Sequence, residues 1–139
     1  TSEISAQSAI IAKNLKVRNI LKVYQKNFIK KNKLCVLEGR DASTKILPSS
    51  DLKFFFICNL NIAAARRYKE LKKTSKNIKF KDVKLALYKR NLMDKNRKNS
   101  PLQKHPDAVV VNTGNLNKQA MLTKMSIHAE KVIKIKYGK

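Results

Sequence analysis

Apolar residues recur along this chain in two patterns, one typical of helices and one typical of short buried strands. Between residues 17 and 29 they fall every three to four positions, as on one side of an α-helix. The runs 34–37 and 52–57 are short, mostly apolar and bounded by turn residues, as in strands that are buried on both faces. The whole pattern predicts two helices within 2–31, further helices at 62–73, 81–98 and 116–135, and strands at 34–37, 52–57 and 108–111.

Short apolar strands separated by helices predict an α/β fold, in which a parallel sheet carries helices on both faces. Ligands of such sheets bind beyond the carboxyl ends of the strands. The turn Gly39-Arg40-Asp41 follows the first predicted strand, and Asn112-Thr113-Gly114 follows the third. These two turns are therefore candidate parts of a binding site.

The predicted helix 81–98 has a charged side and an apolar side. Arg90, Asp94 and Arg97 fall within about sixty degrees of one another on the helical wheel. The opposite side is apolar and is expected to pack inward; it carries Leu85, Tyr88 and Leu92. The charged side could be an exposed ladder of ion pairs, but its setting between two core strands favours a mobile flap over a phosphate site.

The composition fits one domain. The chain has 139 residues, 42% of them hydrophobic, and no apolar run long enough to span a membrane. Cys35 and Cys58 lie within apolar segments and are expected to be buried, reduced thiols. His105 and His128 are isolated, and the spacing of cysteines and histidines predicts no metal site.

The formal charge of +23 has two interpretations. A basic surface could bind nucleic acid without sequence preference. The lysines are spread along the whole chain, however, and no aromatic RNA-binding pattern accompanies them. We therefore favour a Lys-rich composition over a specific nucleic-acid interface.

Arginine is rare in this chain and marks particular places. Of 32 cationic residues only six are Arg. The guanidinium is a planar fork that grips phosphate or carboxylate bidentately, which an ammonium cannot do. Arg40 lies in a turn after a strand, and Arg90 and Arg97 flank Asp94 on a helix. This placement predicts a phosphate site.

These residues resemble the bacterial cytidylate kinases, the (d)CMP kinases, over nearly the whole chain, from Thr1 to about Lys131. The resemblance rests on short motifs in a fixed order, no one of which is decisive alone. They are Thr1-Ser2-Glu3-Ile4, Val17-Arg18-Asn19, Glu38-Gly39-Arg40-Asp41, Leu52-Lys53-Phe54-Phe55, Ala65-Arg66-Arg67-Tyr68, Arg90 to Asp94 with Asn96-Arg97, Ser100-Pro101-Leu102 and Asp107-Ala108-Val109-Val110-Val111.

The resemblance implies how the acceptor nucleotide is bound. Arg18 resembles the arginine that reads the cytosine edge, together with Asp41. Arg40 resembles an arginine that holds the acceptor phosphate of CMP, together with Arg97. An Asp that accepts from the cytosine amino group is a natural way to distinguish cytosine from uracil.

The resemblance also implies catalytic and donor-side roles. Arg90 and Asp94 resemble residues near the sugar, and Arg90 and Arg97 are the catalytic candidates beside the transferring phosphate. Arg66 and Arg67 resemble the base of a lid over ATP. Phosphoryl transfer depends on positioning and charge neutralisation, which arginines supply.

The chain departs from the family at several positions. Ala9, next to Ser8, stands where a serine often contacts the base, and Asn112 where the family usually has Asp. Asn91 and Met93 replace charged residues that are usual in the lid helix. The glycine-rich loop G-x-x-x-x-G-K-[ST], which cradles donor phosphates, is absent.

We therefore expect the C-terminal portion of a cytidylate kinase, an incomplete P-loop nucleoside monophosphate kinase fold without its central first strand. The resemblance implies transfer of the γ-phosphate of ATP to CMP or dCMP with Mg²⁺, whose ligands lie outside this chain, by a cytoplasmic protein that is a monomer when complete. The alternatives are a basic nucleic-acid-binding protein and a CMP-binding module without catalysis. The expected divisions are 1–33 (monophosphate-binding region), 34–64 (core strands and start of the lid helix), 65–100 (lid) and 101–139 (core strand and last helix).

Overall fold

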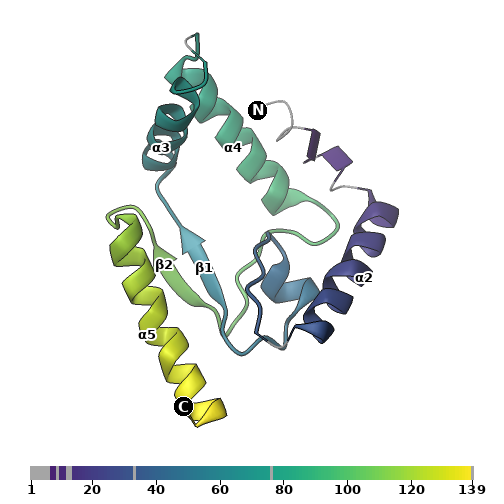
Figure 1. Cartoon of the computed structure of the whole chain (residues 1–139). Coiled ribbons are helices and arrows are strands. Elements are labelled where there is room, and N and C mark those ends of the chain that lie inside the picture. Colours follow the sequence, from purple (N-terminus) through teal and green to yellow (C-terminus); the bar gives the residue numbers. More distant parts are fainter. Residues whose placement is uncertain (1–6, 9, 12–13, 33, 76, 139) are drawn as a thin grey trace. The chain divides into compact units, whose positions relative to one another are not determined.

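The computed structural model describes residues 7–8, 10–11, 14–32, 34–75 and 77–138. Its elements are helix α2 (Leu15–Lys31), a π-helical turn η1 (Ala42–Ile46), strand β1 (Phe54–Ile57), helices α3 (Leu60–Lys72) and α4 (Phe80–Asn96), strand β2 (Val109–Asn112) and helix α5 (Lys118–Tyr137), as drawn in Figure 1. The described residues between 7 and 11 are also helical, whereas the rest of the helix expected there lies outside the described part.

The chain divides into two compact units, which are described separately. The first comprises Thr1–Ser49 and Ala86–Lys104, and the second comprises Ser50–Leu85 and His105–Lys139. The second unit is therefore formed by segments on both sides of residues 86–104.

Asparagine side chains start three of the helices. Asn14 accepts from the Lys16 and Val17 amides at 3.0 and 3.3 Å, which caps α2. Asn59 and Asn117 cap α3 and α5 in the same way. Such caps satisfy amides that have no partner within the helix.

The second unit contains a parallel pair of strands, as the sequence predicts. Phe54 pairs with Val109, and the register continues to Ile57 opposite Asn112. Val111 is fully buried, and Ala64 from α3 is also buried. Helix α5 contacts the sheet through His128, whose ring meets the Phe54 ring edge to face at 6.0 Å.

Segment 34–37 does not form the strand that its apolar residues predict. Leu34 is 84% exposed and Val36 is 99% exposed. A strand needs a hydrogen-bonded neighbour, and the sheet in the described part of the chain consists of β1 and β2 alone. Cys35 lies in this segment and is exposed, so the expected burial of its thiol is wrong, while Cys58 is partly buried.

Helix α4 buries the opposite side from the one predicted. Leu85, Tyr88 and Leu92 are 51%, 49% and 41% exposed, whereas Asp94 is 6% exposed. The expected inward packing of the apolar side is therefore wrong. Asp94 on the charged side is buried because an arginine from another segment of the chain pairs with it, which the wheel of one helix cannot reveal.

Large apolar side chains on the stripe of α2 are also exposed, among them Tyr24 at 70% and Phe28 at 60%. No helix in the described residues is both long and apolar enough to cross a bilayer.

Candidate functional site

Six charged side chains meet in the first unit, and we call them the arginine–aspartate cluster. They are Arg18 from α2, Arg40 and Asp41 from the turn before η1, Arg90 and Asp94 from α4, and Arg97 directly after the end of α4. All six were candidates from the sequence, and the structure brings them together from segments that are far apart in the chain.

Asp41 is held by both its backbone and its side chain. Its carbonyl oxygen accepts from the amides of residues 44–46 at 3.3, 2.9 and 3.3 Å, because the π-helical turn folds back over it. Its carboxylate accepts a hydrogen bond from Arg18 Nη2 and lies 3.7 Å from Arg97 Nη2. Asp41 is only 6% exposed, so these arginines compensate a buried negative charge.

Asp94 is the second buried carboxylate. It accepts from Arg40 Nε at 2.9 Å. Arg97 Nη1 lies 3.6 Å away and Arg90 Nε 3.9 Å away. The backbone carbonyl of Asp94 also accepts from the Leu102 amide at 2.7 Å, which ties the end of α4 to the following turn.

The cluster has more positive than negative charge. Four arginines and two aspartates leave a net charge of +2 (four minus two). Burial, and next the nearby charge of Arg18, lower the pKa of Arg97 from its usual value. Two buried nitrogens, Arg90 Nε and Arg97 Nη2, donate no hydrogen bond to any residue that the structure describes. A buried donor without a partner is costly, so the cluster is suited to bind an anion.

Ser100 holds the Arg97 side chain through its backbone carbonyl, a role that its place in the motif Ser100-Pro101-Leu102 does not reveal. Its φ of 53° is in the left-handed region, which is uncommon for a residue other than glycine. Its carbonyl accepts from Arg97 Nε at 2.5 Å. The residues Asn99-Ser100-Pro101 indicate a turn in the sequence, but they do not reveal that the Ser100 carbonyl points to Arg97.

The two remaining arginine candidates, Arg66 and Arg67, lie on α3 in the second unit. Arg66 Nη2 donates to the carbonyls of Thr113, Gly114 and Leu116 at 2.7, 3.1 and 3.2 Å. Arg67 pairs with exposed Glu70 at 3.0 Å. Neither takes part in the arginine–aspartate cluster.

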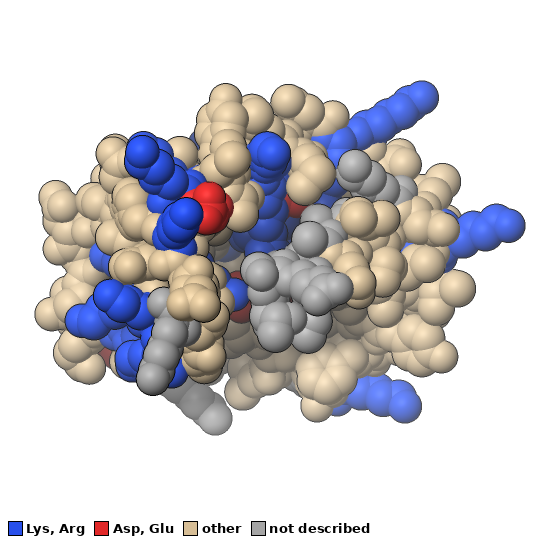
Figure 2. Space-filling model, turned by 90° about the horizontal axis from the view of Figure 1, so that it is seen from above, with Lys and Arg blue, Asp and Glu red and all other residues tan. Residues whose placement is uncertain are grey.

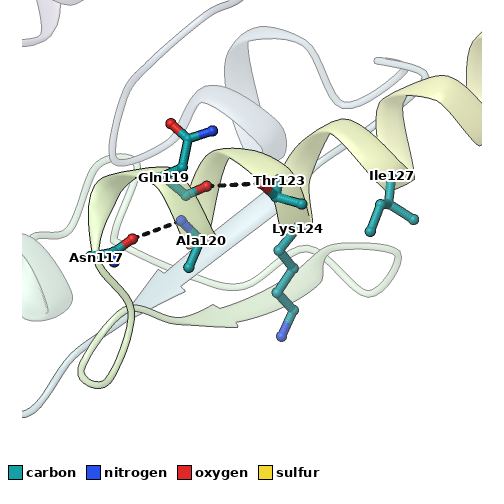
Figure 3. A pocket seen from close by; sticks show the side chains of 6 residues that line it. All are labelled: Asn117, Gln119, Ala120, Thr123, Lys124 and Ile127. Carbon is teal, nitrogen blue, oxygen red and sulfur yellow. Dashed lines mark hydrogen bonds between the residues drawn. The ribbon is translucent and has the colours of Figure 1, made fainter.

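A shallow hollow along α5 offers no comparable chemistry. Its volume is about 500 Å³, and it is lined by Asn117, Gln119, Ala120, Thr123, Lys124 and Ile127. Figure 3 shows that Asn117 Oδ1 accepts from the Ala120 amide, and that Thr123 donates to the Gln119 carbonyl. These polar groups already serve the helix itself.

Charge elsewhere is dispersed. On the face drawn in Figure 2, Lys and Arg side chains are scattered among uncharged residues, with few acidic groups between them. Within the described residues, no three His, Cys, Asp or Glu side chains gather as a metal site.

An α/β fold with a dicationic cluster of arginines around two buried aspartates is typical of proteins that handle phosphorylated ligands. Comparison with known proteins gives the family. The family model described as cytidylate kinase matches residues 1–131. The chain belongs to the cytidylate kinase family, which confirms the resemblance found in its sequence.

Curated relatives agree with this assignment. The chain is 36% identical to a cytidylate kinase from Clostridium tetani over 130 residues, which are 94% of this chain and 57% of the relative. It is 35% identical over 125 residues to a cytidylate kinase from Thermosipho melanesiensis, covering 90% of this chain and 57% of the relative. The chain thus spans a little over half the length of these relatives.

Proposed function

We propose that this chain carries the acceptor-nucleotide site of a cytidylate kinase, which transfers the γ-phosphate of ATP to CMP or dCMP. One observation carries the proposal beyond family membership: the arginine–aspartate cluster has a net charge of +2 and two buried arginine nitrogens that donate to no described residue. A phosphate monoester carries about −1.5 to −2 charges at neutral pH. The acceptor phosphate of CMP therefore matches the cluster in charge and in hydrogen-bonding capacity.

Within this proposal the base is read by Arg18 and Asp41. The Asp41 carboxylate accepts a hydrogen bond from the exocyclic amino group of cytosine, which uracil lacks. Arg18 already donates to this carboxylate, which orients Asp41 for that role.

The phosphate is held by Arg40 and Arg97. Arg40 is fixed through Nε to Asp94, and its two terminal nitrogens donate to no described residue. Arg97 is nearly buried and rigidly supported. Arg90, from α4, lies near the sugar and the transferring phosphate, where its charge stabilises the transition state.

This chain is proposed to supply only part of the site for the phosphate donor. Mg²⁺ would neutralise negative charge on the phosphates of ATP, but the residues described here do not fit the ion. Asp41 and Asp94 are both occupied by arginines, so the ion would be held elsewhere. Arg66 and Arg67 are proposed to lie in a lid over ATP, which comprises residues 65–100. The other proposed divisions of the chain are 1–33, 34–64 and 101–139.

For the complete protein we propose a P-loop nucleoside monophosphate kinase fold, with helices on both faces of its sheet. We propose that it works as a cytoplasmic monomer.

Titration calorimetry of the 139-residue chain with CMP and UMP tests the acceptor site. We expect CMP to bind about tenfold or more tightly than UMP, because the uracil edge cannot donate to Asp41. Equal affinity for both nucleotides would contradict the assignment of Arg18 and Asp41 to the base.

A further inference from the structure

Arg66 on α3 holds the loop between β2 and α5 by its backbone. One guanidinium nitrogen, Nη2, lies within 3.2 Å of three carbonyl oxygens, those of Thr113, Gly114 and Leu116. These residues are separated from Arg66 by 47 to 50 positions in the sequence. This contact therefore fixes the loop to the helix.

Two backbone amides of the same loop donate hydrogen bonds to groups outside the contact with Arg66. The Thr113 amide donates to the Ile57 carbonyl at 2.9 Å, and the Gly114 amide donates to Asn112 Oδ1 at 2.9 Å. A Cβ at position 114 would lie 3.1 Å from that same oxygen, so the turn is tight. The Thr113 carbonyl also accepts from the Leu116 amide at 3.4 Å, whereas the carbonyls of Gly114 and Leu116 accept from Arg66 Nη2.

This loop begins at the carboxyl end of β2, which is where parallel sheets place their ligands. An Nη2 group has two hydrogens, and here three carbonyls share them. They are not available to a phosphate without releasing the loop. Arg67, the next residue, pairs instead with exposed Glu70, and an exposed pair of this kind is weak and easily exchanged.

We propose that Arg66 is a positioning residue of the donor-nucleotide site, acting through the loop 113–116, while the contact with the donor phosphates that the resemblance implies for this pair is left to Arg67. This inference rests on the proposed kinase function. It divides between two adjacent arginines a role that the sequence resemblance gave to both.

The test uses the complete protein of which this chain is proposed to be a part. Rates are measured against ATP concentration, and adenosine, which has no phosphate, is added as a competitive inhibitor. Arg66→Gln should raise the KM for ATP and the inhibition constant of adenosine by the same factor, on the order of tenfold. The kcat and the KM for CMP should change less than twofold.

Arg67→Gln is the matched control on the same helix. This substitution should raise the KM for ATP and leave the inhibition constant of adenosine unchanged, because adenosine has no phosphate that Arg67 could contact. Arg66→Lys should recover part of the loss, since an ammonium can also donate to carbonyls. The Arg66→Lys variant still tests the proposal if the Arg66→Gln variant does not fold.

A larger effect of Arg66→Gln on ATP than on adenosine would make Arg66 a phosphate ligand and overturn the proposal. So would an Arg66→Gln variant that changes neither constant. Failure of the underlying function is a different result, because the unsubstituted protein would then not phosphorylate CMP at all.

Discussion

Replacement of Arg40 by lysine isolates the value of a guanidinium in the arginine–aspartate cluster. Arg40 donates through Nε to Asp94 at 2.9 Å, and its side chain is 44% exposed. Lysine keeps the charge but loses both this fixed orientation and the two terminal nitrogens that would grip a phosphate. The substitution therefore separates geometry from charge.

The size of the effect follows from the exposure of Arg40. A hydrogen bond to a charged group contributes about 1.5–3 kcal/mol, and water competes at a half-exposed side chain. We therefore expect the lower end of this range, about 1.5 kcal/mol, which is about a tenfold weaker affinity for CMP. The lost pair with Asp94 should change the free energy of unfolding by less than about 1 kcal/mol.

Titration calorimetry of the 139-residue chain with CMP measures this change, and urea unfolding monitors stability in parallel. The control is Lys95→Ala, because Lys95 is exposed and lies next to Asp94 on α4. This substitution removes a whole positive charge. We expect it to weaken CMP binding less than twofold. If Arg40→Lys binds CMP as tightly as the unsubstituted chain, Arg40 is not a phosphate ligand and the reasoning fails.

Three further predictions concern the chain by itself. It should not turn over CMP with ATP and Mg²⁺, because it has no phosphate loop; a coupled assay giving more than about 1 s⁻¹, an ordinary kinase rate, would contradict this. Ser100→Gly should leave stability unchanged or raise it by up to about 1 kcal/mol in urea unfolding, because relief of about 1–2 kcal/mol of left-handed strain exceeds the entropy cost of glycine; Ser100→Ala keeps the strain and is the control. The hydrogen bond from Lys136 lowers the pKa of Asp51, so its stabilisation is present above the ordinary pKa of 3.8 and is lost as the pH falls through the lowered value. Unfolding curves at pH 6 and pH 3 should therefore differ less in Asp51→Asn than in the unsubstituted chain, and an equal difference in both would show that this pair does not contribute.

Local signals in the sequence were sufficient for much of the fold. The strands β1 and β2 were predicted within two residues, since short apolar runs bounded by turns need no tertiary information. The members of the arginine–aspartate cluster were also predicted, because arginine is rare in this chain and its few positions are therefore informative.

The errors arose where a distant partner decides the outcome. Segment 34–37 has the composition of a strand, but a strand forms only beside another strand. Helix α4 was assigned the wrong buried side because Asp94 is neutralised by Arg40, which lies 54 residues away. The contact of Arg66 with the loop 113–116 has the same origin, as backbone carbonyls leave no trace in a sequence.

The division of the first unit into Thr1–Ser49 and Ala86–Lys104 has a consequence for how the protein is made. Synthesis runs from the amino end, so Arg18 and Asp41 leave the ribosome together, while Asp94 and Arg97 follow only after β1, α3 and most of α4. Until then Asp41 has Arg18 as its partner, but Arg40 has no Asp94 to fix it. The nascent chain therefore completes its proposed acceptor site late, and a ribosome that stops before Arg90 releases a product with three of the six cluster residues.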